Sequence, residues 1–456
     1  MSFKILSPCG ILGYGYPLEH FKAGLRQNPD AIVVDAGSTD AGPHKLGAGV
    51  AIVSRQACKK DLIPMIIGGK ELRIPVIIGS AGGSGAKVHV NWTLDIIKEI
   101  IEEHGLSPVK IAVIDADIPN SVILDKLKNI IPLGKTVPEL TPERLKKTNG
   151  VVAQMGAEPI IKALRQNPDI VVCGRAYDPS PFAAPAILNG CDPALAYHLG
   201  KILECAALCA EPGTTKDCMM GVIEDGYFEV YPLNSARKCT KISVAAHTFY
   251  EKEHPFILHG PGICLNLENC VFTEKGNGSV QVSGSRITEE KPYRVKLEGA
   301  MQTAYRSFVI AGVRDPLTIS RLKTIEEEVT AQVQDYYDEI DKSSYSINFI
   351  NYGINGVMGS LEQEKELPYE AAVLFEVLAD TQEKAAMILA TVRSSFMHYG
   401  YEGRKATAGN LAFPFAPSDI NFGPVYEFSV YHLMEVSDGC ELFPIRYIEV
   451  QHGKII

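Results

Sequence analysis

Apolar runs alternate with amphipathic stretches through the first half of the chain. Asn91–His104, for example, places Ile96, Ile97, Ile100 and Ile101 on one stripe, which is typical of a helix. Short, mostly apolar runs are typical of strands that are buried on both faces. Six such strands are predicted, each closely followed by Gly, Ser, Asp or Gln: Lys4–Leu6, Ala31–Val34, Pro75–Ile78, Lys110–Ile114, Gly150–Val152 and Ile170–Cys173. The alternation predicts an α/β fold, an N-terminal mostly parallel sheet with helices on both faces.

Beyond residue 240 the pattern changes to short alternating segments that predict antiparallel β-structure. A helix is expected to begin at Asp315-Pro316, an N-cap followed by proline at the first helical position. Two further strands, a helix and a last strand follow. The predicted elements here are the strands Lys241–Tyr250, Ser279–Ser285, Tyr293–Glu298, Ser346–Asn351, Ala371–Ala379 and Val425–Glu435 and the helix Gln382–His398. We therefore predict an α/β domain over residues 1–240, a β-rich domain over 241–345 and a small α+β domain over 346–456.

One stretch of sequence occurs twice. RQNPD stands at residues 26–30 and again at 165–169, in each case after a helical stretch and before a β-branched run. Duplication of a half-domain and local convergence both explain the repeat. Open α/β sheets bind ligands at the carboxyl ends of their strands. The loops that follow the two repeats, beginning at Asp35 and at Gly174, are therefore expected to lie at one shared site.

The composition is that of an ordinary globular chain of 456 residues, 46% hydrophobic and 21% charged. A formal net charge of -10 and the lack of a Lys/Arg-rich block argue against nucleic acid and anionic membranes as partners. The N-terminus lacks the pattern of a secretory signal, so a cytoplasmic location is expected. The 11 cysteines form no Cys-x-x-Cys pair, which favours reduced thiols over a cysteine-based metal site.

The loop after the second predicted strand is dense in reactive groups. Over residues 35–47 it reads DAGSTDAGPHKLG. Asp35, Asp40 and His44 are the candidates for proton transfer, and Ser38 and Thr39 are donors suited to a carboxylate or phosphate. The alternative is a helix-capping turn in which Asp40 and Ser38 only satisfy backbone donors.

A glycine-rich loop, residues 79–85, follows the third predicted strand and leads into a helix. We expect Gly79, Ser80, Gly82 and Gly83 to offer backbone and hydroxyl donors to an oxyanion. The loop matches neither the Walker pattern nor GxGxxG. A second glycine cluster, GILGYG at residues 10–15, leaves a dinucleotide site open as an alternative, although its spacing departs from that fingerprint.

Arg175 and Asp178 lie in the loop CGRAYDPS at residues 173–180. A guanidinium directly after a buried strand must pair with an acid or meet an anion, so Arg175 either binds a substrate carboxylate or pairs with Asp178 or Asp35. Asp115 and Asp117 follow another strand at the same predicted sheet edge. With Asp35 they could hold a divalent metal, although such residues more often cap the next helix.

Two further candidates lie outside the first domain's loops. His247 stands in the segment SVAAHTFYE, predicted as a strand, and is either a core histidine or a general acid/base that faces the cleft. Arg404 lies in a polar loop near the C-terminus and either contacts substrate or is solvated.

At these residues the chain resembles the acyclic terpene utilisation (AtuA) family. The matching stretches are DAGSTDAGP at 35–43, CGRAYD at 173–178, SVAAHTFYE at 243–251, VSGSR at 282–286, VKLEGA at 295–300, AGVRDP at 311–316 and GNLAFPFAPSD at 409–419. The resemblance implies a cytoplasmic protein of the catabolism of branched acids from acyclic terpenes or of other small carboxylates. Members usually continue DAGSTD with Pro-Gly-Pro-Tyr, where this chain has Ala41-Gly42-Pro43-His44.

The sequence favours a lyase, of the hydratase or dehydratase kind, or an isomerase that acts on a small or branched carboxylic acid or its CoA ester. The site is rich in proton-transfer groups and anion donors, and no G-x-S-x-G nucleophile pattern is present. The main alternative is a non-catalytic subunit that binds a metabolite or CoA ester beside a separate enzyme. An NAD-linked oxidoreductase is a third. We expect a homo-oligomer, with or without a small partner subunit; no cofactor is firmly predicted, and a divalent metal is left open.

Overall fold

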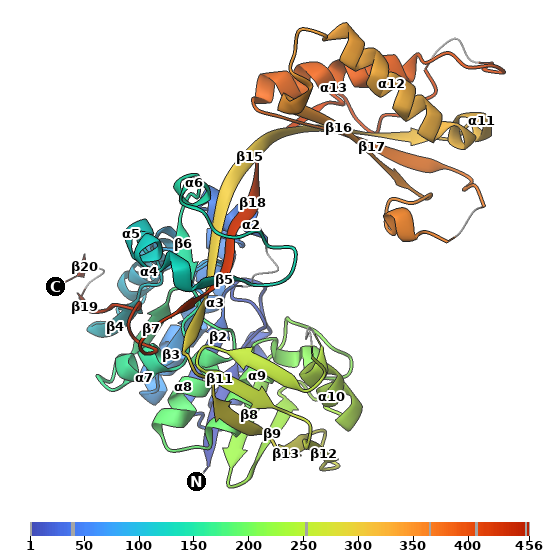
Figure 1. The fold of residues 1–456 in the computed structure, drawn as a ribbon. Helices are drawn as coiled ribbons and strands as arrows, with labels where there is room; N and C mark the ends of the chain where they lie inside the picture. Colours follow the sequence, from blue (N-terminus) through green and yellow to red (C-terminus); the bar gives the residue numbers. More distant parts are fainter. Residues whose placement is uncertain are drawn as a thin grey trace. The chain divides into compact units, whose positions relative to one another are not determined.

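The computed structural model describes residues 2–37, 42–250, 254–363, 366–405, 409–451 and, by their backbone, 454–455. The chain forms two compact units (Figure 1). Unit 1 comprises Met1–Met301 together with Glu427–Ile456, and unit 2 comprises Gln302–Tyr426. Unit 2 is therefore inserted into unit 1, and the two units are described separately. None of the described helices is both long and apolar enough to cross a lipid bilayer.

Unit 1 is built on a large sheet whose centre is parallel. The central strands, in spatial order, are β1 (Phe3–Ser7), β2 (Ala31–Asp35), β3 (Val76–Gly79), β7 (Ile170–Cys173) and β4 (Val109–Ile114). Every residue of β2, β3 and β7 is buried, as the continuous apolar runs predict. Antiparallel strands extend the sheet at both edges: β8 (Met219–Glu224), β9 (Tyr227–Pro232), β13 (Val280–Ser283) and β12 (Val271–Glu274) beyond β1, and β19 (Ile445–Gln451) and β20 (Lys454–Ile455) beyond β4.

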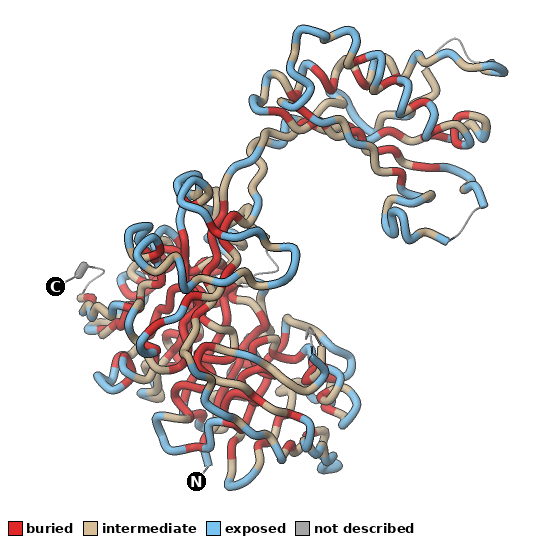
Figure 2. Tube along the Cα trace, in the orientation of Figure 1, coloured by how far each residue is buried: buried red, intermediate tan, exposed pale blue. Residues whose placement is uncertain are grey.

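Helices cover both faces of this sheet, as predicted (Figure 1). One hydrophobic cluster, with Phe21, Leu62 and Ile97, lies under α1, α3 and α4, and the other, with Ile160 and Phe182, lies under α7, α8 and α9. Figure 2 shows the buried positions concentrated in the strands between them. The helices of unit 1 are α1 (Leu18–Leu25), α2 (Pro43–Ala48), α3 (Arg55–Leu72), α4 (Lys87–Glu103), α5 (Asn120–Asp125), α6 (Pro142–Lys146), α7 (Glu158–Leu164), α8 (Ser180–Leu188), α9 (Pro193–Leu203) and α10 (Lys241–Phe249).

The two RQNPD stretches adopt the same turn. Asn28 and Asn167 both have left-handed backbone, with φ of 51° and 50°, one turn beyond the ends of α1 and α7. Asparagine tolerates this conformation better than most residues with a side chain, which explains its place in both copies.

The aspartates of the repeat also make matching contacts. Asp30 accepts a hydrogen bond from the Lys4 amide at 2.7 Å, and Asp169 accepts one from the Lys110 amide at 2.8 Å. In return, the backbone N–H groups of Asp30 and Asp169 donate to the carbonyl oxygens of Lys4 and Lys110. Each repeat thus ties its strand to the neighbouring one, β2 to β1 and β7 to β4, on either side of β3. β7, which leads into the second loop, is therefore held to its neighbour in the same way as β2, which leads into the first.

We expect Asn167→Ala to lower the free energy of unfolding by about 1 kcal/mol, because a β-carbon in the left-handed region is strained unless the side chain is asparagine-like. Asn167→Gly should change it little, since glycine adopts this backbone without strain. Urea unfolding followed by the fluorescence of Trp92, the sole tryptophan, measures both. Asn28→Ala should be destabilised to the same degree. Equal stability of the alanine and glycine variants would show that the left-handed backbone of this turn carries no strain.

Two smaller sheets are formed by the described residues outside this large sheet. A three-stranded antiparallel sheet in unit 1 contains β10 (Ile257–Gly260), β11 (Ile263–Asn266) and β14 (Arg286–Glu289). A further sheet has the order β16 (Tyr345–Tyr352), β17 (Ala371–Ala379), β15 (Arg294–Val313), β18 (Ile420–Glu435) and β5 (Ile130–Pro132), and β6 (Val151–Ala153) also pairs with β15. The long strands β15 and β18 run through both units. In unit 2, α11 (Pro316–Ser320), α12 (Leu322–Tyr336) and α13 (Gln382–Met397) accompany β16 and β17 around a core that includes Ile325 and Phe375.

The segment Lys241–Tyr250, predicted as a strand, is the helix α10, so that prediction was wrong. Its N-terminus carries a reciprocal capping box, in which Thr240 and Ser243 each accept the other's backbone N–H. The division of the chain also differs from the predicted three domains. Residues 241–301 extend unit 1 because β12 and β13 continue its sheet through β9, and the C-terminal stretch returns to unit 1 through β19.

Candidate functional site

Three loops meet at the carboxyl ends of β2, β3 and β7. A β-carbon on Gly37 would lie 1.8 Å from the Gly83 carbonyl oxygen, and one on Gly85 would lie 2.1 Å from the Arg175 amide nitrogen. No side chain fits at either place, so glycine is required for the loops to approach. The two loops that follow the repeat are thereby brought together against the glycine-rich loop, at the sheet edge where open α/β sheets bind their ligands.

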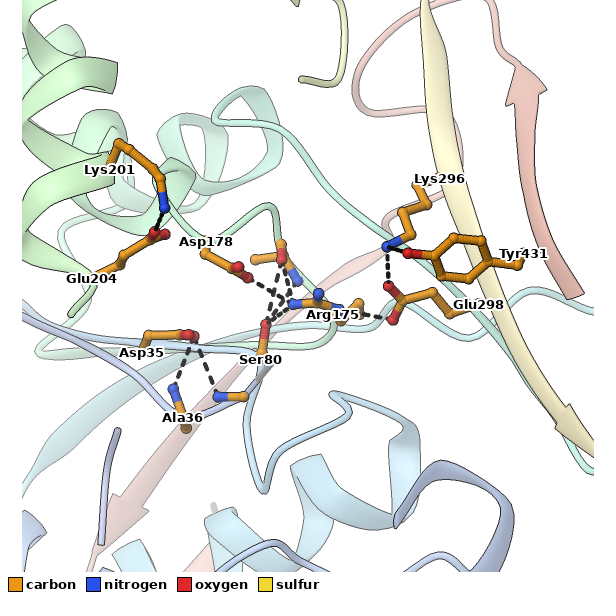
Figure 3. A network of polar contacts seen from close by, with 12 residues as sticks. Asp35, Ala36, Ser80, Arg175, Asp178, Lys201, Glu204, Lys296, Glu298 and Tyr431 are labelled. Atoms are coloured by element: carbon orange, nitrogen blue, oxygen red, sulfur yellow. Dashed lines mark hydrogen bonds and ion pairs between the residues drawn. The ribbon is translucent and has the colours of Figure 1, made fainter. Parts of the chain in front are cut away.

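Arg175 is the centre of this region and is 1% exposed. Its Nε donates to Glu298 at 3.0 Å, and its Nη1 donates to Asp178 at 2.9 Å and to the Ser80 hydroxyl at 2.9 Å (Figure 3). Burial alone would lower the pKa of Arg175, but the charges of Glu298 and Asp178 outweigh it and raise the pKa above its ordinary value. Of the two predicted roles for Arg175, the pair with Asp178 is therefore the one that these contacts support.

Glu298 joins Arg175 to a second cation. Its other carboxylate oxygen accepts from Lys296 at 2.8 Å, and Lys296 donates to the Tyr431 hydroxyl at 3.0 Å. We call Arg175, Asp178, Glu298 and Lys296 the buried ion network. Sequence reasoning assigned no chemistry to Lys296 or Glu298, although VKLEGA was one of the stretches quoted. The sequence did carry a signal for them, because Lys296 and Glu298 alternate with the apolar Val295 and Leu297, which are buried in the same strand.

Asp35 lies at the end of β2 with 4% of its surface exposed. Its Oδ1 accepts from the Ala36 amide at 2.9 Å and faces the Gly37 amide at 3.4 Å. Burial, reinforced by the nearby charge of Asp178, raises the pKa of Asp35 well above its usual range, while Arg175 acts in the opposite direction. Asp35 is therefore a carboxyl group that holds its proton to higher pH than an exposed aspartate does.

A second ion pair lies beside Asp35 at the end of α9. Lys201 donates to Glu204 at 2.6 Å, and the two side chains are 9% and 7% exposed. The Lys201 ammonium also stands 4.3 Å from the centre of the Tyr250 ring, a cation–π distance. The Glu204 carboxylate adds to the charges that raise the pKa of Asp35. This pair was not among the predicted site residues.

His247 lies on α10 and not in a strand, with 6% of its surface exposed. Its ring stacks on Tyr250 with 4.7 Å between the ring centres, and its Nε2 has no hydrogen-bond partner in the described part of the chain. Burial, assisted by the Lys201 charge, lowers the pKa of His247 to about 3. The imidazole is thus neutral at physiological pH.

The glycine-rich loop makes contacts that pack the site together. Ser80 has left-handed backbone, φ 46°, and its hydroxyl accepts from both Arg175 and the Ala176 amide. A β-carbon on Gly79 would lie 2.8 Å from Pro181, and Gly82 and Gly83 have φ of 67° and 113°. The described contacts of this loop are internal, and its proposed anion binding stays a prediction.

Three of the predicted residues, Ser38, Thr39 and Asp40, lie outside the described residues. His44 lies on α2, at an intermediate degree of burial. Its role stays a prediction as well.

Arg404 belongs to unit 2. Its guanidinium donates to the carbonyl oxygens of Met397, at 3.2 Å, and of Tyr399. Arginine at a helix C-terminus satisfies carbonyl groups that lack a partner within the helix, and Arg404 does this for α13. It is not one of the residues that unit 1 brings together.

Asp115 and Asp117 are occupied by protein groups. Asp117 accepts from the Lys87 amide at 2.7 Å, which caps the start of α4, and Asp115 lies 3.4 Å from Arg446. Within the described ranges, no group of three or more His, Cys, Asp or Glu side chains gathers as a metal-binding cluster. The predicted cap on the following helix is not formed, since α5 begins without a side-chain cap, and Asp117 instead contacts the start of α4.

The N-terminal glycine cluster has its amides engaged as well. The Gly13 and Gly15 N–H groups donate to the carboxylate of the buried Asp61 at 2.8 Å and 3.0 Å. A dinucleotide site would need such amides to face the pyrophosphate. This internal carboxylate counts against the dinucleotide alternative.

Comparison with known families places most of the chain in one of them. A family model described as "Acyclic terpene utilisation family protein AtuA" matches residues 70–417. That range contains Arg175, Asp178, Lys201 and Glu298, whereas Asp35 precedes it. No curated protein and no solved structure matches the chain.

Proposed function

The chain belongs to the acyclic terpene utilisation family AtuA, and from this membership we propose that it acts in the catabolism of acyclic terpenes or of related branched acids. The proposed substrate is a small or branched carboxylic acid or its CoA ester. The proposed chemistry is that of a lyase, adding or removing water, or of an isomerase. Removal of water and isomerisation both begin with removal of a proton from the carbon next to the acyl group, and addition of water ends with the return of a proton to that carbon.

The observation that carries this proposal is the pair Asp35 and Asp178. One carboxyl is almost wholly buried and holds its proton to raised pH, and the other is 30% exposed and held by Arg175. Carboxyl groups in different environments divide between the acid and base roles of proton-transfer enzymes. We assign the base role to Asp178, the acid role to Asp35 and a positioning role to Arg175.

The proposed removal of water then runs as follows. The Asp178 carboxylate takes the proton from the carbon next to the acyl group, and the electron pair of that C–H bond forms the carbon–carbon double bond. The C–O bond at the neighbouring carbon breaks, and the hydroxyl takes the proton of Asp35 and leaves as water. Addition of water reverses these steps. In an isomerisation no water leaves, and a proton returns to a different carbon. His247, being neutral, is proposed to donate or accept a hydrogen bond only.

Hydrogen exchange tests the proposal without knowledge of the exact substrate. Purified protein in D2O is incubated with a panel of branched saturated, hydroxylated and unsaturated carboxylates and their CoA esters. We expect deuterium at the carbon next to the acyl group for at least one member, detected by NMR or mass spectrometry. Heat-denatured protein is the control. The absence of both exchange and turnover across the panel would contradict the proposal.

We keep the non-catalytic subunit as a second proposal, because a loop of unit 2 exposes apolar side chains. Val357, Leu361 and Tyr369, between β16 and β17, are 83%, 71% and 80% exposed. Such residues suit a protein partner when they gather on one surface. Affinity purification from the native cell separates the proposals: an obligate partner, with exchange only in its presence, favours the subunit.

A further inference from the structure

We propose that unit 1 has a separate binding site for a small organic anion, in a pocket of about 410 Å³ next to the buried ion network. The pocket is lined by the start of β15, the end of the adjacent β18 and the β10–β11 turn. The inference rests on the pocket's own groups and does not depend on the proposed reaction.

A row of charges leads from the pocket into the protein. Arg294, Lys296 and Glu298 alternate along β15 with the buried Val295 and Leu297. Because successive side chains of a strand point to opposite faces, the three charged residues share one face. Arg294 and Lys296 line the pocket, and Glu298 lies behind them with 5% of its side chain exposed.

The pocket has an excess of positive charge. Arg294 makes no salt bridge to any acid in the described part of the chain, and Lys296 shares the Glu298 carboxylate with Arg175. Figure 3 shows that Lys296 and Arg175 contact different oxygens of the Glu298 carboxylate. Among the described residues, the pocket wall carries one acid, Glu290, which lies 3.0 Å from His259, so the lining holds two permanent cations, Arg294 and Lys296, against one carboxylate. A concave site with unbalanced cations concentrates anions.

The remaining lining defines the kind of anion. The Tyr431 hydroxyl accepts from Lys296, so its own proton is available to a ligand oxygen, and Gln154 adds a side-chain amide. Leu133 and Leu433 supply apolar surface in the same pocket. A few convergent polar groups on an apolar lining are typical of small-ligand sites. The pocket therefore suits a molecule with one oxyanion group and a compact apolar body.

The oxyanion can be a carboxylate or a phosphate, and isothermal titration calorimetry distinguishes them. The probes are 3-methylbutanoate, acetate, inorganic phosphate and the neutral 3-methylbutanamide. We expect saturable binding of 3-methylbutanoate, weaker binding of acetate and none of the amide. Tighter binding of inorganic phosphate than of either carboxylate would assign the site to a phosphorylated ligand. Binding of the amide as tight as that of 3-methylbutanoate would overturn the proposal.

Variants locate the site. Arg294→Gln is expected to weaken binding of the preferred anion about tenfold or more, the loss typical of a charge-assisted hydrogen bond. Leu433→Ala should reduce the preference for 3-methylbutanoate over acetate. Arg286→Gln is the matched control: this arginine is exposed on β14 and does not line the pocket, so its loss should leave the affinity unchanged.

The test of anion binding does not depend on whether the proposed reaction takes place. Asp35→Asn should bind the anion as the wild type does, since Asp35 is not part of this pocket. No saturable binding to the wild type, or equal binding by the wild type and Arg294→Gln, would overturn the proposal. Circular dichroism of each variant shows whether it is folded, and Arg294→Lys, which keeps the charge, should retain part of the affinity if Arg294→Gln does not fold.

Discussion

Replacing Arg175 with methionine is expected to lower the free energy of unfolding of unit 1 by about 3–5 kcal/mol. The substitution leaves Glu298, which is 5% exposed, and Asp178 without the cation that both contact. Glu298 keeps only Lys296, and a carboxylate that loses a cation in the interior is costly because water does not take the place of that cation. Urea unfolding followed by Trp92 fluorescence reports on unit 1, since the tryptophan lies on α4.

A compensating variant tests the cause. In the double variant Arg175→Met and Asp178→Asn, Glu298 keeps its pair with Lys296 and no unpaired carboxylate remains around the methionine. It should be more stable than the single variant, because neutral amides cost less to bury than charges. If the single variant loses less than about 1 kcal/mol, the value of an exposed pair, water reaches these carboxylates and the ion network is not a buried one.

Replacing Asp35 with asparagine is expected to reduce the rate of the proposed loss or addition of water by about 10²–10⁴, the usual contribution of a positioned acid or base. Asparagine keeps the shape of the side chain and an oxygen for the Ala36 amide, so the fold should be preserved. Interconversion of the hydroxylated and unsaturated acids of the panel, followed by NMR, measures the loss. Asp30→Asn is a control aspartate in the turn before the same strand and should retain the rate of turnover. Unchanged turnover in Asp35→Asn would remove Asp35 from the mechanism.

Asp35→Asn should also change how the free energy of unfolding depends on pH. Because the pKa of Asp35 is raised in the folded state, its stabilising contribution is present at low pH and is lost as the pH rises from about 4 through the folded value. In this window the unfolded chain has released the proton that the folded chain still holds. The wild type should therefore lose more stability with rising pH than Asp35→Asn does. Parallel urea titrations between pH 4 and pH 8 would show the difference in slope.

The centre of the fold was predictable because its signals are local. Buried β-branched runs identified β2 and β7, and the repeated Asn-Pro-Asp turns marked where each begins. The segment that forms α10 carries alternating small and apolar residues, which fit a strand as well as a helix, and its capping box at Thr240 was overlooked. The insertion of unit 2 was not visible either, because its boundaries fall within the continuous strands β15 and β18 and not in a linker.

The candidate site was predictable only in part for a related reason. Asp35, Arg175 and Asp178 follow strands directly, so strand prediction was enough to place them at one sheet edge. Glu298 and Lys201 come from a distant strand and from a helix, and their approach to these residues depends on tertiary packing. The partner of a guanidinium cannot be read from its own loop, so the sequence left Arg175 with two roles, binding a substrate carboxylate or pairing with Asp178 or Asp35. In the structure it contacts Asp178 and also Glu298, which was not among the predicted partners.

The chain leaves unit 1 along β15 and returns along the adjacent β18, with the Thr303 hydroxyl 3.4 Å from the Val425 carbonyl oxygen just beyond the junction. A short turn from Met301 to Glu427 would therefore close the larger unit without rerouting any other segment. Unit 2 can therefore be deleted from the gene as one continuous segment. The shortened protein offers a direct way to assign proton transfer, anion binding and partner binding to one of the two units.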